Sequence, residues 1–149
     1  MLNFMPFTYE YPRPAVTVDI MIFSKEKRGT EILLIQRKHD PFKDCWALPG
    51  GFVDMDETLM ESALRELQEE TSITGIGLQQ FKTYGDPGRD PRGRTVSVIF
   101  YGFAEKSKIF TRAADDAKHL EWFPVHKLPP LAFDHDKIIR EAIESRVSS

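Results

Sequence analysis

The chain has 149 residues, of which 41% are hydrophobic and 11% aromatic, and this length and composition predict one compact domain with a hydrophobic core. Its net charge of −3 argues against electrostatic binding of nucleic acid, and no apolar run is long enough to cross a membrane. Cys45 is the single cysteine and cannot form an internal disulfide, which suits a reducing cytoplasm.

Hydrophobic patterning predicts a single domain over residues 1–149, in which residues 1–14 form an extended, proline- and aromatic-rich arm. In chain order the predicted elements are strands at Ala15–Phe23 and Glu31–Arg37, a helix at Glu57–Thr71, strands at Leu78–Tyr84, Thr95–Ala104 and Leu120–Pro124, and a helix at Asp136–Arg146. Asp134 or Asp136 is expected to cap the last helix. This mixture favours an α/β fold, an α/β/α sandwich around a mixed β-sheet.

The predicted helix at residues 57–71 contains no glycine or proline and carries one apolar stripe. Glu66, Glu69 and Glu70 fall within an arc of roughly 100° beside that stripe. Carboxylates in this position lose hydration and repel one another, so a cation is the natural compensation. The alternative is a solvated acidic helix face, which most charge runs form.

These glutamates belong to a longer pattern at residues 51–73, GFVDMDETLMESALRELQEETSI. The pattern resembles the Nudix box, G-x5-E-x7-R-E-U-x-E-E-x-G-U with U aliphatic, and departs from it at Ser72, where the box has glycine. Helices often end in a left-handed residue at this point, so we expect Ser72 to cost about 1 kcal/mol at most. A strand, a loop and the Pro49-Gly50-Gly51 turn precede the helix, in the order that the Nudix fold requires.

The resemblance implies a site for Mg²⁺, with Mn²⁺ as an alternative. The implied metal ligands are the carbonyl of Gly50 and the carboxylates of Glu66, Glu69 and Glu70, with Glu57 as a supporting or additional ligand. Arg65 is implied to orient the glutamates through an ion pair, although an ordinary helical salt bridge has the same appearance. The implied catalytic residues are Arg65, Glu66, Glu69 and Glu70.

A second signature lies at residues 84–100, YGDPGRDPRGRTVSVIF, where Arg89, Arg92 and Arg94 crowd a turn. Arginine binds phosphate bidentately, whereas composition alone favours a solvated hairpin with local ion pairs. The segment is similar to one in the ADP-ribose pyrophosphatases of the Nudix family and in Nudix-type regulators of NAD metabolism. With WALPGGFV at residues 46–53 it indicates ADP-ribose, and Arg37 completes the predicted substrate-binding arginines.

The resemblance therefore implies metal-dependent hydrolysis of ADP-ribose to AMP and ribose 5-phosphate. One alternative is a non-catalytic, ADP-ribose-sensing Nudix domain of a regulator; another is a hydrolase of oxidised nucleotides, dinucleoside polyphosphates or nucleotide sugars. Such regulators often have a degraded box followed by a DNA-binding winged helix. Here every acidic position is filled, and the chain ends 15 residues after Asp134, which leaves no room for such a winged helix. We therefore expect a small nucleotide as substrate. From the net charge and the apolar runs, we expect neither nucleic acid nor membrane as partner.

The general base is less defined by the sequence. Its candidates are Glu69, Asp115, Asp116 and Glu121, although Asp115 and Asp116 read more simply as a turn or helix start. For the Asp134–Asp136 segment, a helix cap with a surface histidine is favoured over a catalytic histidine.

Aromatic residues of the sequence are candidates for an adenine-binding slot and for a dimer interface. Tyr11, Phe42 and Phe100 are candidate walls for adenine, with burial in the core as the alternative. Family relatives often dimerise, and the aromatic segment Phe4–Tyr11 is the candidate interface for a homodimer.

Overall fold

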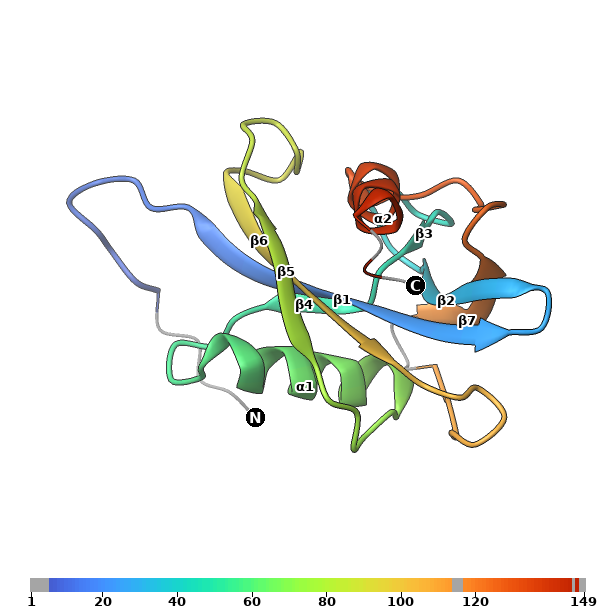
Figure 1. Ribbon diagram of the computed structural model, residues 1–149. Helices are drawn as coiled ribbons and strands as arrows, with labels where there is room; N and C mark the ends of the chain where they lie inside the picture. Colours follow the sequence, from blue (N-terminus) through green and yellow to red (C-terminus); the bar gives the residue numbers. More distant parts are fainter. Residues whose placement is uncertain (1–5, 114–116, 146, 148–149) are drawn as a thin grey trace.

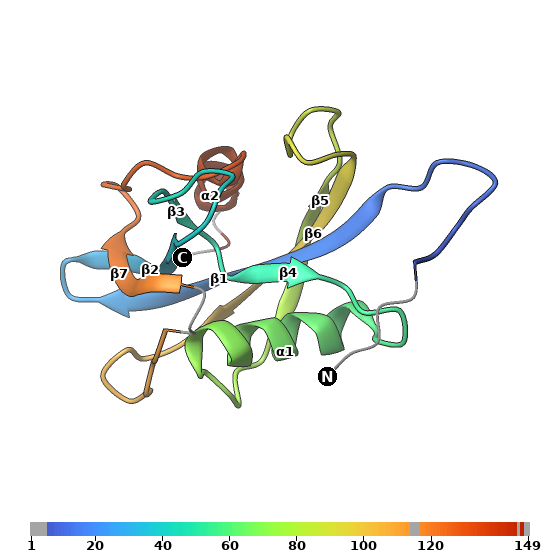
Figure 2. The ribbon, with the colours of Figure 1, turned by 180° about the vertical axis from the view of Figure 1, so that it is seen from behind.

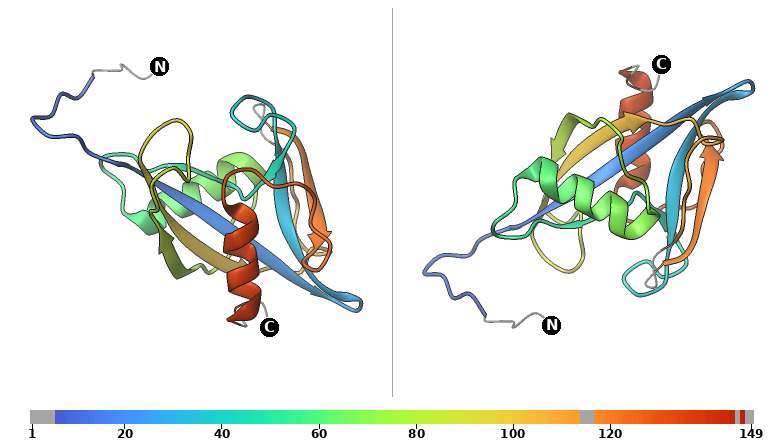
Figure 3. Two further views of the ribbon diagram at one scale, coloured as in Figure 1. Left: turned by 90° about the horizontal axis from the view of Figure 1, so that it is seen from above. Right: turned by 90° about the horizontal axis from the view of Figure 1, so that it is seen from below.

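A mixed sheet lies between two helices in the computed structural model, which describes residues 6–113, 117–145 and 147 (Figure 1). The elements are β1 (Ala15–Glu26), β2 (Gly29–Arg37), β3 (Trp46–Ala47), β4 (Gly50–Phe52), α1 (Leu59–Thr71), β5 (Gln79–Tyr84), β6 (Thr95–Phe103), β7 (Ala117–Pro124) and α2 (His135–Glu144). Figures 2 and 3 show α1 and α2 on opposite faces of the sheet. The predicted α/β/α sandwich is confirmed.

The sheet is organised around its central strand β1. Its strand order is β3-β2-β1-β6-β5, with β4 paired to β1 and β7 paired to β2. β1 and β6 run parallel, and the other pairs are antiparallel. In the β1–β4 pair Asp19 lies opposite Gly50, so the glycine turn that precedes α1 is attached directly to the middle of the sheet.

The side chains of β1 alternate between two hydrophobic cores, as the two-residue period of a strand requires. Val18, Ile20 and Ile22 belong to the core that includes Ala63 and Leu67 of α1. Met21 and Phe23 belong to the core of α2, together with Ile138, Ile139 and Ala142. Asp19 lies on the same face of β1 as Met21 and Phe23, because it is an even number of residues from both. It is therefore a buried carboxylate near the start of α2.

Both ends of α1 have a local cause. The helix begins at Leu59 rather than Glu57 because Thr58 is the N-cap, and its side chain accepts a hydrogen bond from the Glu61 amide at 3.1 Å. It ends at Thr71, and the C-cap residue Ser72 has a left-handed φ of 66° and an amide that donates to the Gln68 carbonyl at 2.8 Å. The left-handed conformation expected at this position is confirmed.

The predicted strands are confirmed with shifted ends, and the two short strands β3 and β4 were not predicted because two or three residues give no periodicity. α2 begins one residue earlier than predicted, and Arg146, its predicted end, lies outside the described residues. Residues 6–14 of the predicted arm precede β1 and are exposed. None of the helices in the described ranges has the length and hydropathy needed to cross a bilayer.

Candidate active site

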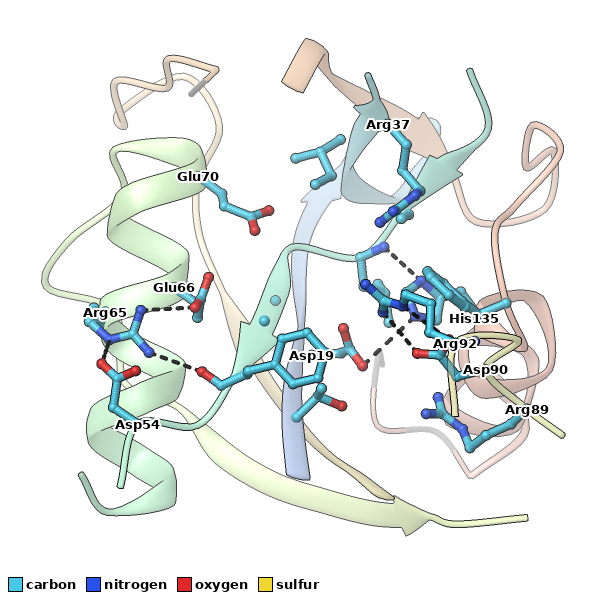
Figure 4. Close-up of a pocket in the computed structure, with 18 residues that line it drawn as sticks. Asp19, Arg37, Asp54, Arg65, Glu66, Glu70, Arg89, Asp90, Arg92 and His135 are labelled. Carbon is cyan, nitrogen blue, oxygen red and sulfur yellow. Dashed lines mark hydrogen bonds and ion pairs between the residues drawn. The ribbon is translucent and has the colours of Figure 1, made fainter. Parts of the chain in front are cut away.

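A pocket of about 440 Å³ opens between α1, the centre of the sheet and the segment before α2. Figure 4 shows its two walls. Asp54, Glu66 and Glu70 lie on the α1 side, and Arg37, Arg89, Arg92 and His135 lie on the opposite side. The pocket thus brings together two glutamates of the box, Glu66 and Glu70, and three of the four predicted substrate-binding arginines, with Asp19 between them.

The two glycines of the turn are required by close packing. A Cβ at Gly51 would lie 2.5 Å from Glu66 Oε1, and a Cβ at Gly50 would overlap the Val18 carbonyl oxygen and Asp19 Oδ1. The turn therefore presses flat against β1 on one side and against the Glu66 carboxylate on the other.

Arg65 lies among three glutamates of the box. Its Nε donates to Glu57 Oε2 at 2.8 Å, and its Nη1 donates to Glu66 Oε1 at 2.8 Å and to Glu69 Oε2 at 3.2 Å. Glu57 also accepts a hydrogen bond from Ser62 Oγ at 2.7 Å. The bonds from Arg65 and Ser62 lower the pKa of Glu57 to about 2. Glu57 turns toward Arg65 and is absent from the pocket lining, which is the geometry of a supporting residue.

Glu66 is the most deeply placed carboxylate of the box, with 9% of its surface exposed. Burial raises its pKa despite the hydrogen bond from Arg65, so a cation close to it would relieve an unfavourable charge. Glu70 lines the same pocket, whereas Glu69 is 58% exposed at its side chain and lies outside the lining.

The fit to a divalent cation follows from the chemistry of these donors. Carboxylate and carbonyl oxygens are the ligands that Mg²⁺ and Mn²⁺ prefer. Within the described ranges, however, no three acidic, histidine or cysteine side chains are close enough together to hold a metal ion. Arg65 holds the carboxylates of Glu66 and Glu69 in this arrangement, so closing them around an ion requires those side chains to turn.

Arg89 is engaged inside the protein. Its Nε and Nη2 donate to Asp134 Oδ2 and Oδ1 at 2.9 and 2.7 Å, and only 5% of its side chain is exposed. This pair ties the arginine-rich turn to the start of α2. It also explains why Asp134 occupies the N-cap position of α2 without making the predicted capping bond.

Arg92 and Arg37 lie beside aromatic rings at the same wall. Arg92 forms an ion pair with Asp90 at 2.8 Å and stands 5.3 and 5.4 Å from the ring centres of Phe52 and Phe133. Arg37 stands 5.0 Å from the Phe133 ring and donates to the Pro41 carbonyl at 2.7 Å. Both guanidinium groups are therefore held in place at the pocket.

Arg94, the fourth predicted substrate-binding arginine, lies outside the pocket lining. Its Nη2 donates to the Gly85 carbonyl at 2.8 Å, across the turn that carries the other arginines. The structure thus places it where it stabilises the turn.

The prediction of a surface histidine at residue 135 is wrong. His135 is 3% exposed, its Nδ1 accepts a hydrogen bond from the Leu48 amide at 3.0 Å, and its Nε2 lies 3.8 Å from Asp19 Oδ2. Asp19 also accepts a hydrogen bond from Ser97 Oγ at 2.5 Å. Sequence analysis missed this cluster, although one signal was present: Asp19 interrupts an otherwise apolar strand.

The remaining candidates lie apart from the pocket or outside the described residues. Phe100 is 2% exposed in the core facing α1, so its prediction as an adenine wall is wrong. Tyr11 is 71% exposed on the arm, and Phe42 contacts the lining residue Phe133 with ring centres 4.9 Å apart. Glu121 is exposed on β7 and does not line the pocket, and the candidates at residues 115 and 116 lie outside the described residues.

A search against family models matches the NUDIX domain over residues 13–142. The chain belongs to this family. The match spans both walls of the pocket and includes all the predicted site residues of the Nudix box and of the arginine-rich turn.

Two curated proteins are similar in sequence to this chain over most of its length. It is 44% identical over 131 residues to the ADP-ribose pyrophosphatase of Methanocaldococcus jannaschii, a match that covers 88% of this chain and 74% of that protein. It is 40% identical over 137 residues to the ADPR responsive transcriptional repressor NtrR of Acinetobacter baylyi, with 89% of this chain and 54% of the repressor covered. The chain therefore spans about half the length of the repressor.

Two solved structures resemble this one closely. The NUDIX domain of Shewanella oneidensis NrtR, in complex with ADP ribose, aligns with a TM-score of 0.83 and 32% identity over 91% of this chain and 90% of that chain. A bifunctional NMN adenylyltransferase/ADP ribose pyrophosphatase from Francisella tularensis, in complex with AMP and a manganese ion, aligns with a TM-score of 0.77 and 33% identity over 92% of this chain and 43% of that one.

Proposed function

We propose that this protein is a Nudix pyrophosphohydrolase that converts ADP-ribose and water to AMP and ribose 5-phosphate. The observation that carries the proposal is a single pocket with acidic residues of the box, whose acidic positions are all filled, on one wall and arginines with aromatic rings on the other. In the reaction the oxygen of water bonds to one phosphorus and a proton of the water passes to a general base, while the bridging P–O bond breaks and the second phosphate leaves with the bridging oxygen.

The acidic wall is the proposed binding site for Mg²⁺, with Mn²⁺ as the alternative. Glu66, Glu70 and the carbonyl of Gly50 would hold the ion, joined by Glu69 once it turns from Arg65. A hard divalent ion supplies neutralisation of phosphate charge and a lower pKa for a bound water. Glu57 acts through Arg65, whose guanidinium it holds in place.

The arginine wall is the proposed binding site for the diphosphate and the terminal ribose. Arg92 and Arg37 present guanidinium groups at the pocket, and Phe52, with 48% of its surface exposed, offers a ring against which a base or sugar can pack. We assign Arg89 to the same wall, where its pairing with Asp134 fixes the position of the turn.

The proposed general base is Glu69. Its carboxylate is 58% exposed and therefore open to water, and once turned from Arg65 it would lie beside the proposed metal site.

The test is a phosphatase-coupled release assay with ADP-ribose, a dinucleoside polyphosphate, a nucleotide sugar and common nucleoside triphosphates, in magnesium and in EDTA. We expect magnesium-dependent formation of AMP from ADP-ribose and a loss of orders of magnitude in Glu70→Gln. Glu61→Gln is the matched control, because Glu61 lies on the same helix but does not line the pocket. Full turnover in Glu70→Gln would overturn the assignment of the metal site, and turnover of another substrate alone would overturn ADP-ribose.

A second candidate function is ADP-ribose sensing without catalysis, favoured by the 40% identity to the Acinetobacter repressor. Tight binding of ADP-ribose by the protein in magnesium, with no release of AMP, would support this function and reject hydrolysis. The binding is measured by isothermal titration calorimetry on the same preparation as the release assay.

We also propose that the protein forms a homodimer. The described part of the arm exposes Phe7, Tyr9 and Tyr11, which is an aromatic surface suited to a protein interface. Light scattering on the full chain and on a Phe7→Ser/Tyr11→Ser variant tests this role: the variant is expected to be monomeric at concentrations where the parent is a dimer.

A further inference from the structure

The turn that carries Gly50 and Gly51 is held by its backbone from both sides. The Trp46 amide donates to the Pro130 carbonyl at 3.0 Å, and the Trp46 carbonyl accepts from the Ala132 amide at 2.8 Å. The Pro49 carbonyl accepts from the Ile20 amide of β1 at 2.8 Å. Between these points, the Leu48 amide donates to a side chain, the Nδ1 atom of His135, at 3.0 Å.

This hydrogen bond fixes the state of the His135 ring. A backbone amide only donates, so Nδ1 carries no proton, and a neutral imidazole must then carry its proton on Nε2. Complete burial lowers the pKa of His135 and keeps the ring neutral. In this tautomer Nε2 presents an N–H group and has no lone pair with which to accept a proton from water, so His135 is unsuited to act as the general base.

The contacts of His135 reach the glycine turn by two routes. Nε2 lies 3.8 Å from Asp19 Oδ2, and the same Asp19 is paired through its backbone with Gly50 in the β1–β4 ladder. Leu48, held by Nδ1, lies two residues before Gly50 in the chain. The imidazole therefore connects both sides of the glycine turn, one through a backbone amide and the other through the carboxylate that packs against Gly50.

We propose that His135 is a positioning residue, which sets the glycine turn of the pocket by accepting the Leu48 amide at Nδ1 and directing Nε2–H toward Asp19. Displacing the turn moves the Gly50 carbonyl and the glycine surface against which the Glu66 carboxylate packs. The consequence for metal binding rests on the proposed function; the tautomer and the hydrogen bond do not.

The tautomer is read from a long-range ¹H–¹⁵N spectrum of the ¹⁵N-histidine-labelled protein. The other three histidines, His39, His119 and His126, are exposed, and the His135→Asn variant identifies the signal of His135 by its loss. We expect a single neutral tautomer with the proton on Nε2. A proton on Nδ1, or a ring that exchanges between both tautomers, would overturn the inference whether or not the protein is an enzyme.

The positioning role is tested by Mn²⁺ binding to the metal-free protein, followed by electron paramagnetic resonance, and by kcat and KM for ADP-ribose. His135→Leu removes the acceptor, and we expect Mn²⁺ affinity to fall about 10–100-fold, as for other supports of metal ligands, with a larger change in kcat than in KM. In His135→Asn the amide oxygen can take the place of Nδ1, and we expect Mn²⁺ affinity close to that of the parent.

The outcomes separate the inference from the proposed function. Parental Mn²⁺ affinity in a folded His135→Leu variant, or equal losses in the Leu and Asn variants, would overturn the positioning role. A parent protein that binds no Mn²⁺ and releases no AMP would overturn the proposed function and the metal consequence together. Should His135→Leu not fold, the tautomer in the parent still decides the hydrogen bond at Nδ1, and a loss of Mn²⁺ affinity in His135→Asn would overturn the positioning role.

Discussion

Arg89 and Asp134 allow a double-mutant test of how the arginine-rich turn works. Arg89 was predicted from the sequence to bind substrate, yet both hydrogen bonds of its fork to Asp134 are short, at 2.9 and 2.7 Å. The perturbation is Arg89→Ala, Asp134→Ala and the combination of the two. If Arg89 acts mainly by holding the turn against α2, the three variants should have nearly the same defect.

The magnitude follows from burial. The side chains of Arg89 and Asp134 are 5% and 20% exposed. Removing one partner of a buried ion pair leaves the other charge without compensation, which lowers the free energy of unfolding by about 3–5 kcal/mol. We expect about 3 kcal/mol for each single variant, the lower limit, because Asp134 keeps partial access to water. The double variant leaves no stranded charge, so its loss should be similar to that of one single variant and well below the sum of the two.

The assays are urea denaturation and the steady-state kinetics of ADP-ribose hydrolysis. We expect non-additive losses of stability and similar increases in KM in all three variants. Arg94→Ala is the control, because Arg94 bonds a backbone carbonyl of the same turn and lies outside the pocket lining. Additive losses of stability would refute the buried-pair reasoning. An Arg89→Ala defect in KM far exceeding that of Asp134→Ala would show that Arg89 contacts the substrate directly.

Three further predictions concern the Nudix box. Ser72→Gly should stabilise the fold by about 1 kcal/mol in urea denaturation, because Ser72 has a φ of 66°; an unchanged midpoint would contradict this. The folded state lowers the pKa of Glu57 from 4.5 to about 2, so Glu57 stabilises the fold above pH 4.5 and this contribution is lost as the pH falls toward 2. Glu57→Gln should therefore flatten the acid-unfolding profile measured by circular dichroism, and a profile as steep as that of the parent would reject this linkage. Gly51→Ala, which meets the movable Glu66 carboxylate, should keep its melting temperature but lose turnover, whereas Gly50→Ala meets fixed backbone and should unfold; the reverse order would reject the packing argument.

The elements that sequence analysis predicted well are those with local causes. α1 follows from a helical run without glycine or proline, and its ends follow from the capping residue Thr58 and the left-handed Ser72. The buried stretch of β1 follows from an apolar run. The resemblance to the box implied that Arg65 would pair with the glutamates, and its contact with Glu69 has a local cause, because residues four apart on a helix share one face.

The parts that were missed depend on contacts between distant segments. Leu48 and His135 are 87 residues apart, and Asp19 and Ser97 are 78 apart, so no local pattern indicates either hydrogen bond. The roles of the arginines were hidden for the same reason. The sequence does not distinguish the three arginines of the turn, Arg89, Arg92 and Arg94, from one another. Only the folded structure gives Arg89 a buried partner 45 residues away.

The charges of the pocket lead to a final prediction about how metal and nucleotide bind. Arg92 is paired with Asp90, and Arg89 with Asp134, so much of the positive charge of the arginine wall is already balanced. A diphosphate entering without metal would face the carboxylates of Glu66 and Glu70 across the pocket with little compensation. Metal and nucleotide should therefore favour each other's binding, and thermodynamic linkage requires the coupling to be equal in both directions.

AMP, the proposed product, permits this measurement without turnover. We expect calorimetry to show about 10-fold tighter binding of AMP in Mn²⁺ than in EDTA, and the same factor for Mn²⁺ affinity with and without AMP, within the usual range of such couplings. Glu70→Gln should reduce the coupling, whereas the control Glu61→Gln should preserve it. Equal AMP affinity with and without Mn²⁺ would mean that the arginine wall alone compensates the phosphate charge, and that the two walls of the pocket work independently.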